Sequence, residues 1–158
     1  MSSPAYFNDS TRAIITNVRL GLRVDRATAT LPQTTASAIF NVVGGTVAIT
    51  AILGEVTTII QNQANNTKLT ANPTTGTSVD ICTVLDIAND EAGSLYSVGT
   101  FTTGALVGGA AGAALLPDAP VAVNIGTIDL DCAASNTGAI KWSIWYVPLE
   151  DGAYIESA

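Results

Sequence analysis

Short apolar runs, separated by turn-forming residues about every 8 to 15 positions, are the feature that most restricts how this chain can fold. Side chains of a strand alternate between two faces, so apolar residues at every second position indicate a strand with one buried face. The chain lacks long stretches with the three- and four-residue spacing of amphipathic helices. The sequence therefore predicts an all-β fold, an antiparallel β-sandwich or a jelly-roll-like barrel with little helix.

Two of the apolar runs, Ala36 to Val43 and Thr46 to Leu53, flank the pair Gly44-Gly45. Both glycines can adopt positive φ, so this pattern predicts a β-hairpin with a two-residue turn. After Gly54 the apolar positions change parity, which predicts a β-bulge at that glycine.

Further strands follow the same alternation. Thr77 to Ile87 is predicted to be one strand, with Val79, Ile81, Leu85 and Ile87 on its apolar face. Val121 to Cys132 is predicted to be a strand with a bulge at Gly126, beyond which Asp129 and Asp131 point away from the core. A strand is also expected over Ser94 to Phe101, and a loop or irregular edge segment over Gly104 to Leu116.

Ala139 to Val147 is apolar on both faces. Trp142 lies on the more apolar face, while Trp145 and Val147 lie on the other. We expect this strand to be covered on both sides. The second covering would come from a neighbouring subunit at Trp145, because interface cores favour tryptophan.

Charge is scarce: only 12% of the 158 residues are charged, about half the usual share. Large uncharged patches mark contact surfaces, so we expect an oligomer or a protein that lives bound to another. The first 26 residues hold four basic and two acidic side chains, against two basic and eleven acidic thereafter. This asymmetry predicts an N-terminal arm over residues 1–20, lying on an acidic surface of a neighbouring copy or another protein, ahead of one β domain over residues 21–158. The alternative is a first strand with solvated arginines.

Several function classes are disfavoured by what the sequence lacks. Without histidine, Ser-His-Asp, Cys-His and His-zinc sites cannot form. A net charge of −7 argues against a nucleic-acid partner. No stretch resembles a signal peptide or a membrane span, so we expect a soluble protein synthesised in the cytoplasm.

The remaining reactive residues do not form a recognisable site. The spacing of Asp129 and Asp131 does not select the carboxylate geometry of a glycosidase. A calcium loop needs a different spacing from that of Asp86, Asn89, Asp90 and Glu91. Two cysteines, Cys82 and Cys132, are expected to be buried and reduced in a cytoplasmic chain. We therefore expect neither enzymatic activity, nor a metal, nor a cofactor.

Three stretches are similar to those of a known protein family: Ile39 to Val47 (IFNVVGGTV), Leu69 to Cys82 (LTANPTTGTSVDIC) and Ala134 to Ala153 (ASNTGAIKWSIWYVPLEDGA). They resemble capsid decoration, or cement, proteins of tailed bacteriophages. The resemblance implies a β-sandwich or jelly-roll-like subunit, often trimeric, that sits on the outside of the icosahedral shell and bridges neighbouring capsomers. The chain departs from the family in showing no long anchoring tail.

The expected function is thus that of a structural virion protein, a homotrimer that stabilises a capsid by binding the major capsid protein. Its interface residues are predicted to be Tyr6, Phe7, Arg12, Arg19, Arg23, Trp145 and Tyr154. Two alternatives stay open. One is a tail-tube or other phage structural subunit, and the other is a carbohydrate-binding β-sandwich that uses Trp145, Tyr154, Asp129 and Asp131.

Overall fold

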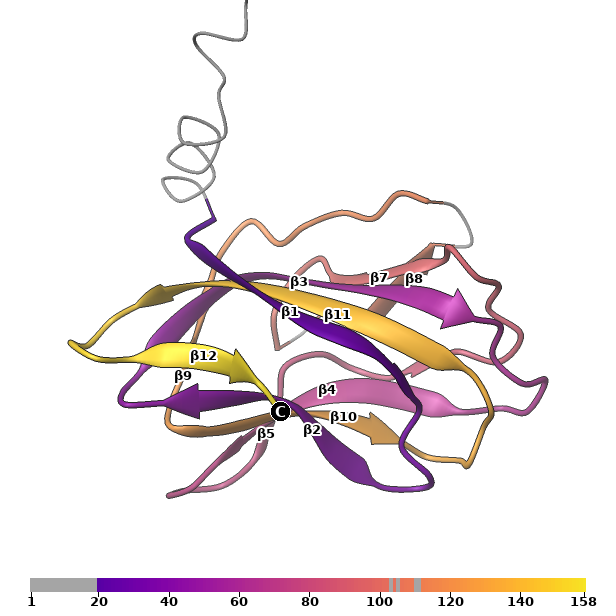
Figure 1. Cartoon of the computed structure of the whole chain (residues 1–158), viewed down its shortest axis with the longest axis horizontal. Coiled ribbons are helices and arrows are strands. Elements are labelled where there is room, and N and C mark those ends of the chain that lie inside the picture. The colour runs from indigo at the N-terminus through magenta and orange to yellow at the C-terminus, as the bar shows by residue number, and fades with distance from the viewer. Residues whose placement is uncertain (1–19, 103, 105, 110–111) are drawn as a thin grey trace, which may run out of the picture.

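The computed structural model describes residues 20–158 except 103, 105, 110 and 111, and its strands form two antiparallel sheets (Figure 1). Sheet I has the strand order β1 (Leu22–Thr30), β11 (Ala139–Pro148), β3 (Val47–Thr58), β7 (Leu95–Val98) and β8 (Leu106–Gly109), and β9 (Val121–Val123) also pairs with β3. Sheet II has the order β12 (Tyr154–Ser157), β2 (Ala36–Val43), β10 (Gly126–Cys132), β4 (Asn66–Pro73) and β5 (Val79–Asp80), and β6 (Leu85–Asp86) also pairs with β4.

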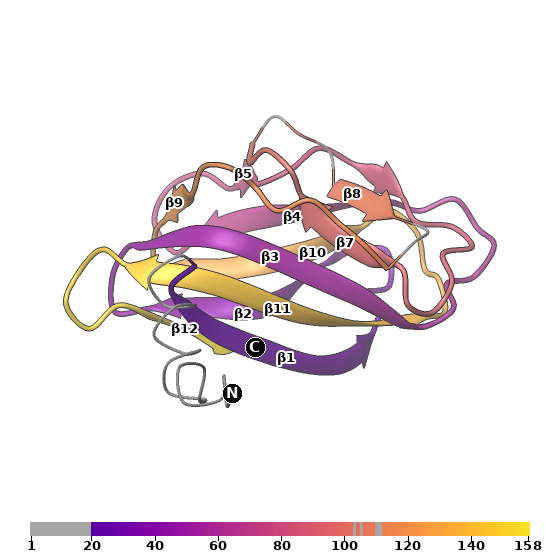
Figure 2. The same ribbon diagram turned by 90° about the horizontal axis from the view of Figure 1, so that it is seen from above.

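The two sheets pack face to face, which confirms the prediction of an all-β sandwich. The part of the chain that the structure describes contains no helix. Along the chain, β1, β2, β3 and β4 fall alternately in sheet I and sheet II, so successive strands cross the core instead of pairing. Figure 2 shows the result from above, with β1, β11 and β3 side by side across one face.

The core lies between the sheets and is built by the alternation that the sequence displays. On β11 the inward side chains Ile140, Trp142, Ile144 and Tyr146 are all buried, as predicted. Sheet II contributes Phe40 and Ile128 to the same cluster. Burying each large apolar side chain contributes about 1.5–3 kcal/mol, so this shared core is the main stabilising element of the fold.

Trp142 packs over a glycine. In the register of sheet I, Gly54 on β3 lies between Trp142 on β11 and Tyr96 on β7. A Cβ atom on Gly54 would lie 2.7 Å from the indole ring, whereas the Tyr96 ring stacks on that ring at 6.4 Å. The absence of a side chain at Gly54 therefore lets the two aromatic rings meet across the strand between them.

The predicted bulge at Gly54 is displaced. The register of β3 shifts where Trp145 pairs with Ala51 and Tyr146 with Ile49, so the extra residue is Thr50. The parity change that the sequence shows is real, but it begins near Thr50. The glycine serves the packing of Trp142 instead.

The predicted hairpin at Gly44-Gly45 is wrong. Strand β2 belongs to sheet II and β3 to sheet I, so the two glycines carry the chain from one sheet to the other. Gly44 has a φ of +80°, and a Cβ there would lie 2.2 Å from the Gly152 carbonyl oxygen. The close approach of the turn before β12 therefore explains the glycine at position 44, and a hairpin is not needed to explain it.

The single strand predicted over Thr77 to Ile87 is also wrong, because it is broken into β5 and β6. Ile81 and Cys82 are consecutive and both buried, while Val79 is exposed, so the strand alternation fails. After Ile81 the backbone bonds to another partner, with the Thr83 N–H donating to the Gly104 carbonyl at 2.8 Å.

The strand predicted over Val121 to Cys132 divides between the sheets, with β9 in sheet I and β10 in sheet II. Gly126 marks this crossing and not a bulge: a Cβ there would meet the Asn72 carbonyl oxygen at 2.3 Å. Asp129 is buried, with 7% of its surface exposed, rather than solvated. The strand predicted over 94–101 is present only as the shorter β7, and the small-residue segment after it supplies the edge strand β8.

Replacement of Gly54 by alanine tests the aromatic stack. We expect Gly54→Ala to lower the free energy of unfolding by about 2–3 kcal/mol, because the rigid indole cannot move away without disturbing a packed core. Urea unfolding followed by fluorescence measures the change. Gly112→Ala is the control, since a Cβ there meets nothing within 4 Å; equal stability of the two variants would contradict the packing role.

Stability should also fall in alkali. Burial raises the pKa of Tyr96 above its ordinary 10.0, assisted by its 2.5 Å hydrogen bond to Asp90, and burial raises the pKa values of Cys82 and Cys132 above 9.0. The folded state holds these protons more tightly than the unfolded chain does. Their contribution is therefore complete below about pH 9 and is lost as the pH rises further.

Urea midpoints measured between about pH 8 and pH 11 should show this decline. In Tyr96→Phe the part of the decline above pH 10 should be reduced. That variant should already be about 1 kcal/mol less stable at neutral pH, because it lacks the hydrogen bond to Asp90. A wild-type urea midpoint that stays constant up to pH 11 would contradict the raised pKa values of Tyr96, Cys82 and Cys132 in the folded state.

Candidate interaction surface

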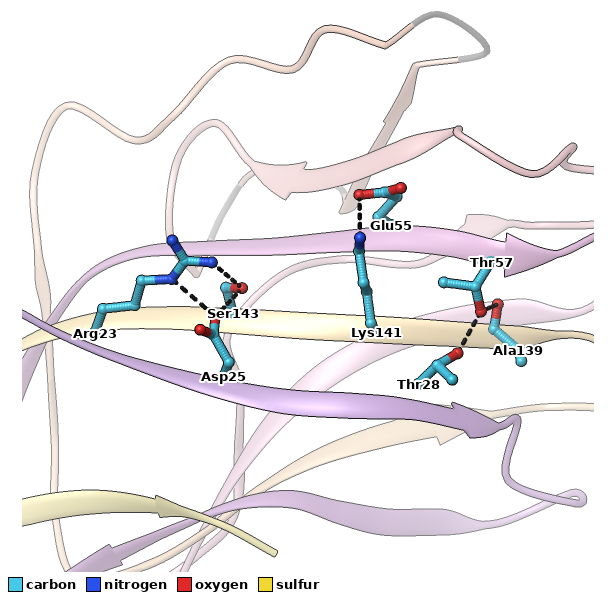
Figure 3. Close-up of polar contacts among 8 residues, drawn as sticks. All are labelled: Arg23, Asp25, Thr28, Glu55, Thr57, Ala139, Lys141 and Ser143. Carbon is cyan, nitrogen blue, oxygen red and sulfur yellow. Dashed lines mark hydrogen bonds and ion pairs between the residues drawn. The ribbon is translucent and has the colours of Figure 1, made fainter.

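The outer face of sheet I, formed by the outward side chains of β1, β11 and β3, is the best candidate for a functional surface (Figure 3). Alternation along β11 places Trp145 on this face while its neighbours Ile144 and Tyr146 are buried. The same face carries Arg23 from β1, which is directly opposite Trp145 in the strand register.

Arg23 and Trp145 form a preorganised pair. The guanidinium carbon of Arg23 lies 5.2 Å from the centre of the Trp145 ring, within the range of a cation–π contact. Its Nε donates to Asp25 Oδ1 at 2.8 Å, and its Nη2 donates to Ser143 Oγ at 3.4 Å. Three contacts thus hold one long side chain over the indole, which reduces the entropy lost if a partner binds there.

Asp25 links the members of this cluster. The hydroxyl of Ser143 donates to Asp25 Oδ1 at 2.6 Å, so the carboxylate accepts from both Ser143 and Arg23. Burial alone raises the pKa of Asp25, but these hydrogen bonds and the charge of Arg23 outweigh it and hold the pKa below its usual range. The cluster therefore keeps its ion pair at neutral pH.

The rest of the outer face is balanced in charge. Lys141 on β11 and Glu55 on β3 are directly opposite each other, and Lys141 Nζ lies 2.9 Å from Glu55 Oε2. Next to this ion pair the two strands are joined by uncharged groups, because the Thr57 hydroxyl donates to the Ala139 carbonyl at 3.2 Å. Of the three basic residues on the strands of sheet I, Arg23 and Lys141 thus each pair with an anion on this face, whereas Arg26 forms no ion pair within the described residues.

The N-terminal segment enters the fold beside this face. The Thr50 hydroxyl donates a hydrogen bond to the carbonyl of Leu20, the first described residue. Val147, on the same side of β11 as Trp145, keeps 40% of its surface exposed. Exposed apolar surface, the Arg23 side chain and the first described residue therefore lie close together.

The structure brings together two of the predicted interface residues and separates a third. Arg23 and Trp145 are neighbours on sheet I, whereas Tyr154 is on β12 of sheet II with 44% of its surface exposed. The remaining four predicted residues, Tyr6, Phe7, Arg12 and Arg19, lie outside the described residues.

Sequence reasoning missed the partners of Arg23. Ser143 and Asp25 were not predicted to belong to the surface, and they meet only because β1 pairs with β11 across more than a hundred residues of chain. No local pattern signals this pairing. The short Arg23-Val24-Asp25 alternation was the available hint, since it places two opposite charges on one face of a strand.

The strands of the two sheets differ in charge. Those of sheet I carry three basic and two acidic residues, and those of sheet II carry one basic residue and five acidic residues. In sheet II Lys68 pairs with Asp80 at 2.8 Å. The acidic residues of the strands are therefore concentrated on the sheet opposite the Arg23–Trp145 pair.

Reactive side chains do not gather elsewhere in the described ranges. Within them, no three His, Cys, Asp or Glu residues are placed to hold a metal ion. Both cysteines are buried and free, as expected for reduced thiols. Asp129 accepts a hydrogen bond from Asn72 Nδ2 at 3.3 Å on sheet II, on the other side of the sandwich from Trp145. In the same described part of the chain, no helix has the length and apolarity required to span a membrane.

Comparison of the chain with known proteins finds no match. No protein-family model matches this chain, and no curated protein or solved structure matches it either.

The cover that Arg23 provides over Trp145 can be measured by fluorescence, because the other tryptophan, Trp142, is only 1% exposed. In Arg23→Ala we expect stronger acrylamide quenching and a red-shifted emission, since Trp145 becomes accessible to solvent. Stability should change by less than about 1 kcal/mol, as is usual for an exposed cation–π pair. Lys141→Ala is the matched control, because it removes a cation of the same face that pairs with Glu55 instead; equal quenching in both variants would contradict the contact.

Proposed function

We propose that this chain is a structural virion protein that binds the outside of a bacteriophage capsid and stabilises it by bridging capsomers. The observation that carries an interaction role is the outer face of sheet I, where Arg23 is held over Trp145 on a surface of balanced charge. The virion setting rests on the resemblance of three sequence segments to capsid decoration proteins.

The Arg23–Trp145 pair has the properties of an interface hot spot. Tryptophan and arginine are enriched among residues that dominate binding energy, and a side chain held before binding loses little entropy on association. An apolar neighbour, Val147, and a surrounding surface without excess charge limit the cost of removing water. These features support docking against a protein surface more than they support catalysis.

The proposed mechanism is mechanical. Each subunit contributes a modest contact, and an oligomer that engages several capsid positions gains affinity by multivalency. Because the protein binds the assembled shell and not its separated parts, binding stabilises the shell by mass action. A trimer is the proposed form, and the major capsid protein is the proposed partner.

The carbohydrate-binding alternative is less well supported by the geometry. Its four candidate residues fall on opposite sheets, with Trp145 on sheet I and Asp129, Asp131 and Tyr154 on sheet II. A sugar would also need the face of the Trp145 ring that Arg23 occupies.

Co-sedimentation with capsids that lack the protein tests the proposal. Trp145→Ser and Arg23→Ala should each weaken binding to such capsids by at least about ten-fold, because removal of a hot-spot side chain costs more than about 1.4 kcal/mol. Tyr154→Ser is the control. It removes an aromatic side chain that the sequence predicts at the interface but that lies on the other sheet, and it should leave capsid binding unchanged.

Two further measurements separate the parts of the proposal. Deletion of residues 1–12 should abolish capsid binding while unfolding curves stay the same, and retained binding would remove the arm from the proposed interface. Light scattering of the purified protein should show an oligomer at micromolar concentration, whereas a monomer would contradict the trimer.

A further inference from the structure

A groove made of hollows that share lining residues begins at Leu20, where the described part of the chain begins. It consists of three adjoining hollows of about 370, 290 and 360 Å³. The first is lined by Leu20 and Thr50, and it shares Asp118 with the second. The second shares Val121 with the third, which ends at Val79 and Ile81. We call this the side groove.

We propose that the side groove is the docking site of residues 12–19 of the same chain. This inference does not depend on the proposed capsid function, because it concerns the free protein. It divides the predicted arm into a docked part next to the fold and a free part, residues 1–11, that contains Tyr6 and Phe7.

The far hollow of the side groove is apolar. Ile81 and Val123 form buried parts of its wall, and Val79 at its rim keeps 55% of its surface exposed on a strand of two residues. An exposed valine beside buried isoleucine and valine favours an apolar occupant. Residues 12–19 have the sequence RAIITNVR, which supplies Ile14, Ile15 and Val18.

The near part of the side groove is acidic. Asp118 is exposed where the first and second hollows join, and in the part of the chain that the structure describes no cation pairs with it. Arg19 directly precedes Leu20, which lines the same hollow. An arginine is therefore attached to the chain at the place where an unneutralised carboxylate lies.

The backbone along the side groove also has an open edge. Strand β9 (Val121–Val123) pairs with β3 on one side, and it pairs with no other described strand. An extended segment that enters the groove can add to this edge by main-chain hydrogen bonds, as in β-strand addition.

The segment is long enough to pass the first two hollows and enter the third. The lining chain of the first two hollows, from Leu116 to Val121, spans at most about 18 Å, and eight extended residues before Leu20 reach about 26 Å. Because the segment is tethered at Leu20, its effective concentration at the groove is in the millimolar range, so weak contacts suffice for docking. The start of the groove at Leu20 favours the chain's own segment over that of a second copy.

Limited proteolysis with trypsin tests the docking, because trypsin cuts after Arg12 and Arg19. In the full-length protein, cleavage at both sites should be at least about ten-fold slower than in a synthetic peptide of residues 8–24, since a docked segment must open before it is cut. Cleavage as fast as in the peptide would overturn the proposal.

Substitutions locate the docking site. Val79→Asp should raise the cleavage rate to near that of the peptide, because a carboxylate would then face the isoleucines of the segment. Val84→Asp is the matched control, as Val84 is 49% exposed but lies outside the groove. Asp118→Asn should accelerate cleavage after Arg19, and Asp151→Asn, in an exposed turn, should not. Protection that persists in Val79→Asp would overturn the assignment to this groove.

Dilution distinguishes the chain's own segment from that of a neighbour. Intramolecular docking predicts the same protection after about a hundred-fold dilution, because the effective concentration is set by the tether. Protection that disappears on dilution would overturn docking within one chain and would assign the groove to a second copy.

Discussion

The contact of Trp142 with Gly54 is the interaction on which the rest of the sandwich depends. It places the largest buried side chain of β11 over β3, where the indole meets Tyr96 of β7, so three strands of sheet I are joined by one aromatic stack. A glycine is required because any side chain at that position would occupy the volume of the ring. The hydrogen bond from Tyr96 to Asp90 extends the same stack to the loop before β7.

The packing of the core determines what the outer surface presents. Because Trp142, Ile144 and Tyr146 point inward, alternation turns Ser143 and Trp145 outward. The pairing of β1 with β11 then brings Arg23 and Asp25 to these residues, and the resulting cluster is held by contacts on a rigid sheet rather than on a loop. A surface whose side chains are already held in place favours binding, since these side chains lose little conformational entropy when a partner binds.

Charge is distributed between the sheets so that each surface has a different character. Sheet I holds the paired Arg23–Asp25 and Lys141–Glu55, and sheet II carries most of the unbalanced acidic residues of the strands. A balanced face can approach another protein without a large desolvation cost, whereas an acidic face favours solubility and repels like surfaces. This distribution supports the proposal that the sheet I face makes the contact with a partner and the sheet II face meets solvent.

The amino-acid sequence by itself determined the all-β class, most strand positions and the inward face of β11, because these follow from side-chain alternation and local propensity. It did not determine which strands pair. The glycines at 44–45 and 126 predict a hairpin and a bulge, yet both mark crossings between sheets. A positive φ or a missing side chain fits a tight turn, a bulge and a close crossing equally well, and only contacts with distant residues such as Gly152 and Asn72 distinguish them. The same holds for the contact of Arg23 with Trp145. The sequence predicts both as interface residues, but the contact between them depends on the long-range pairing of β1 with β11, which only the tertiary structure decides.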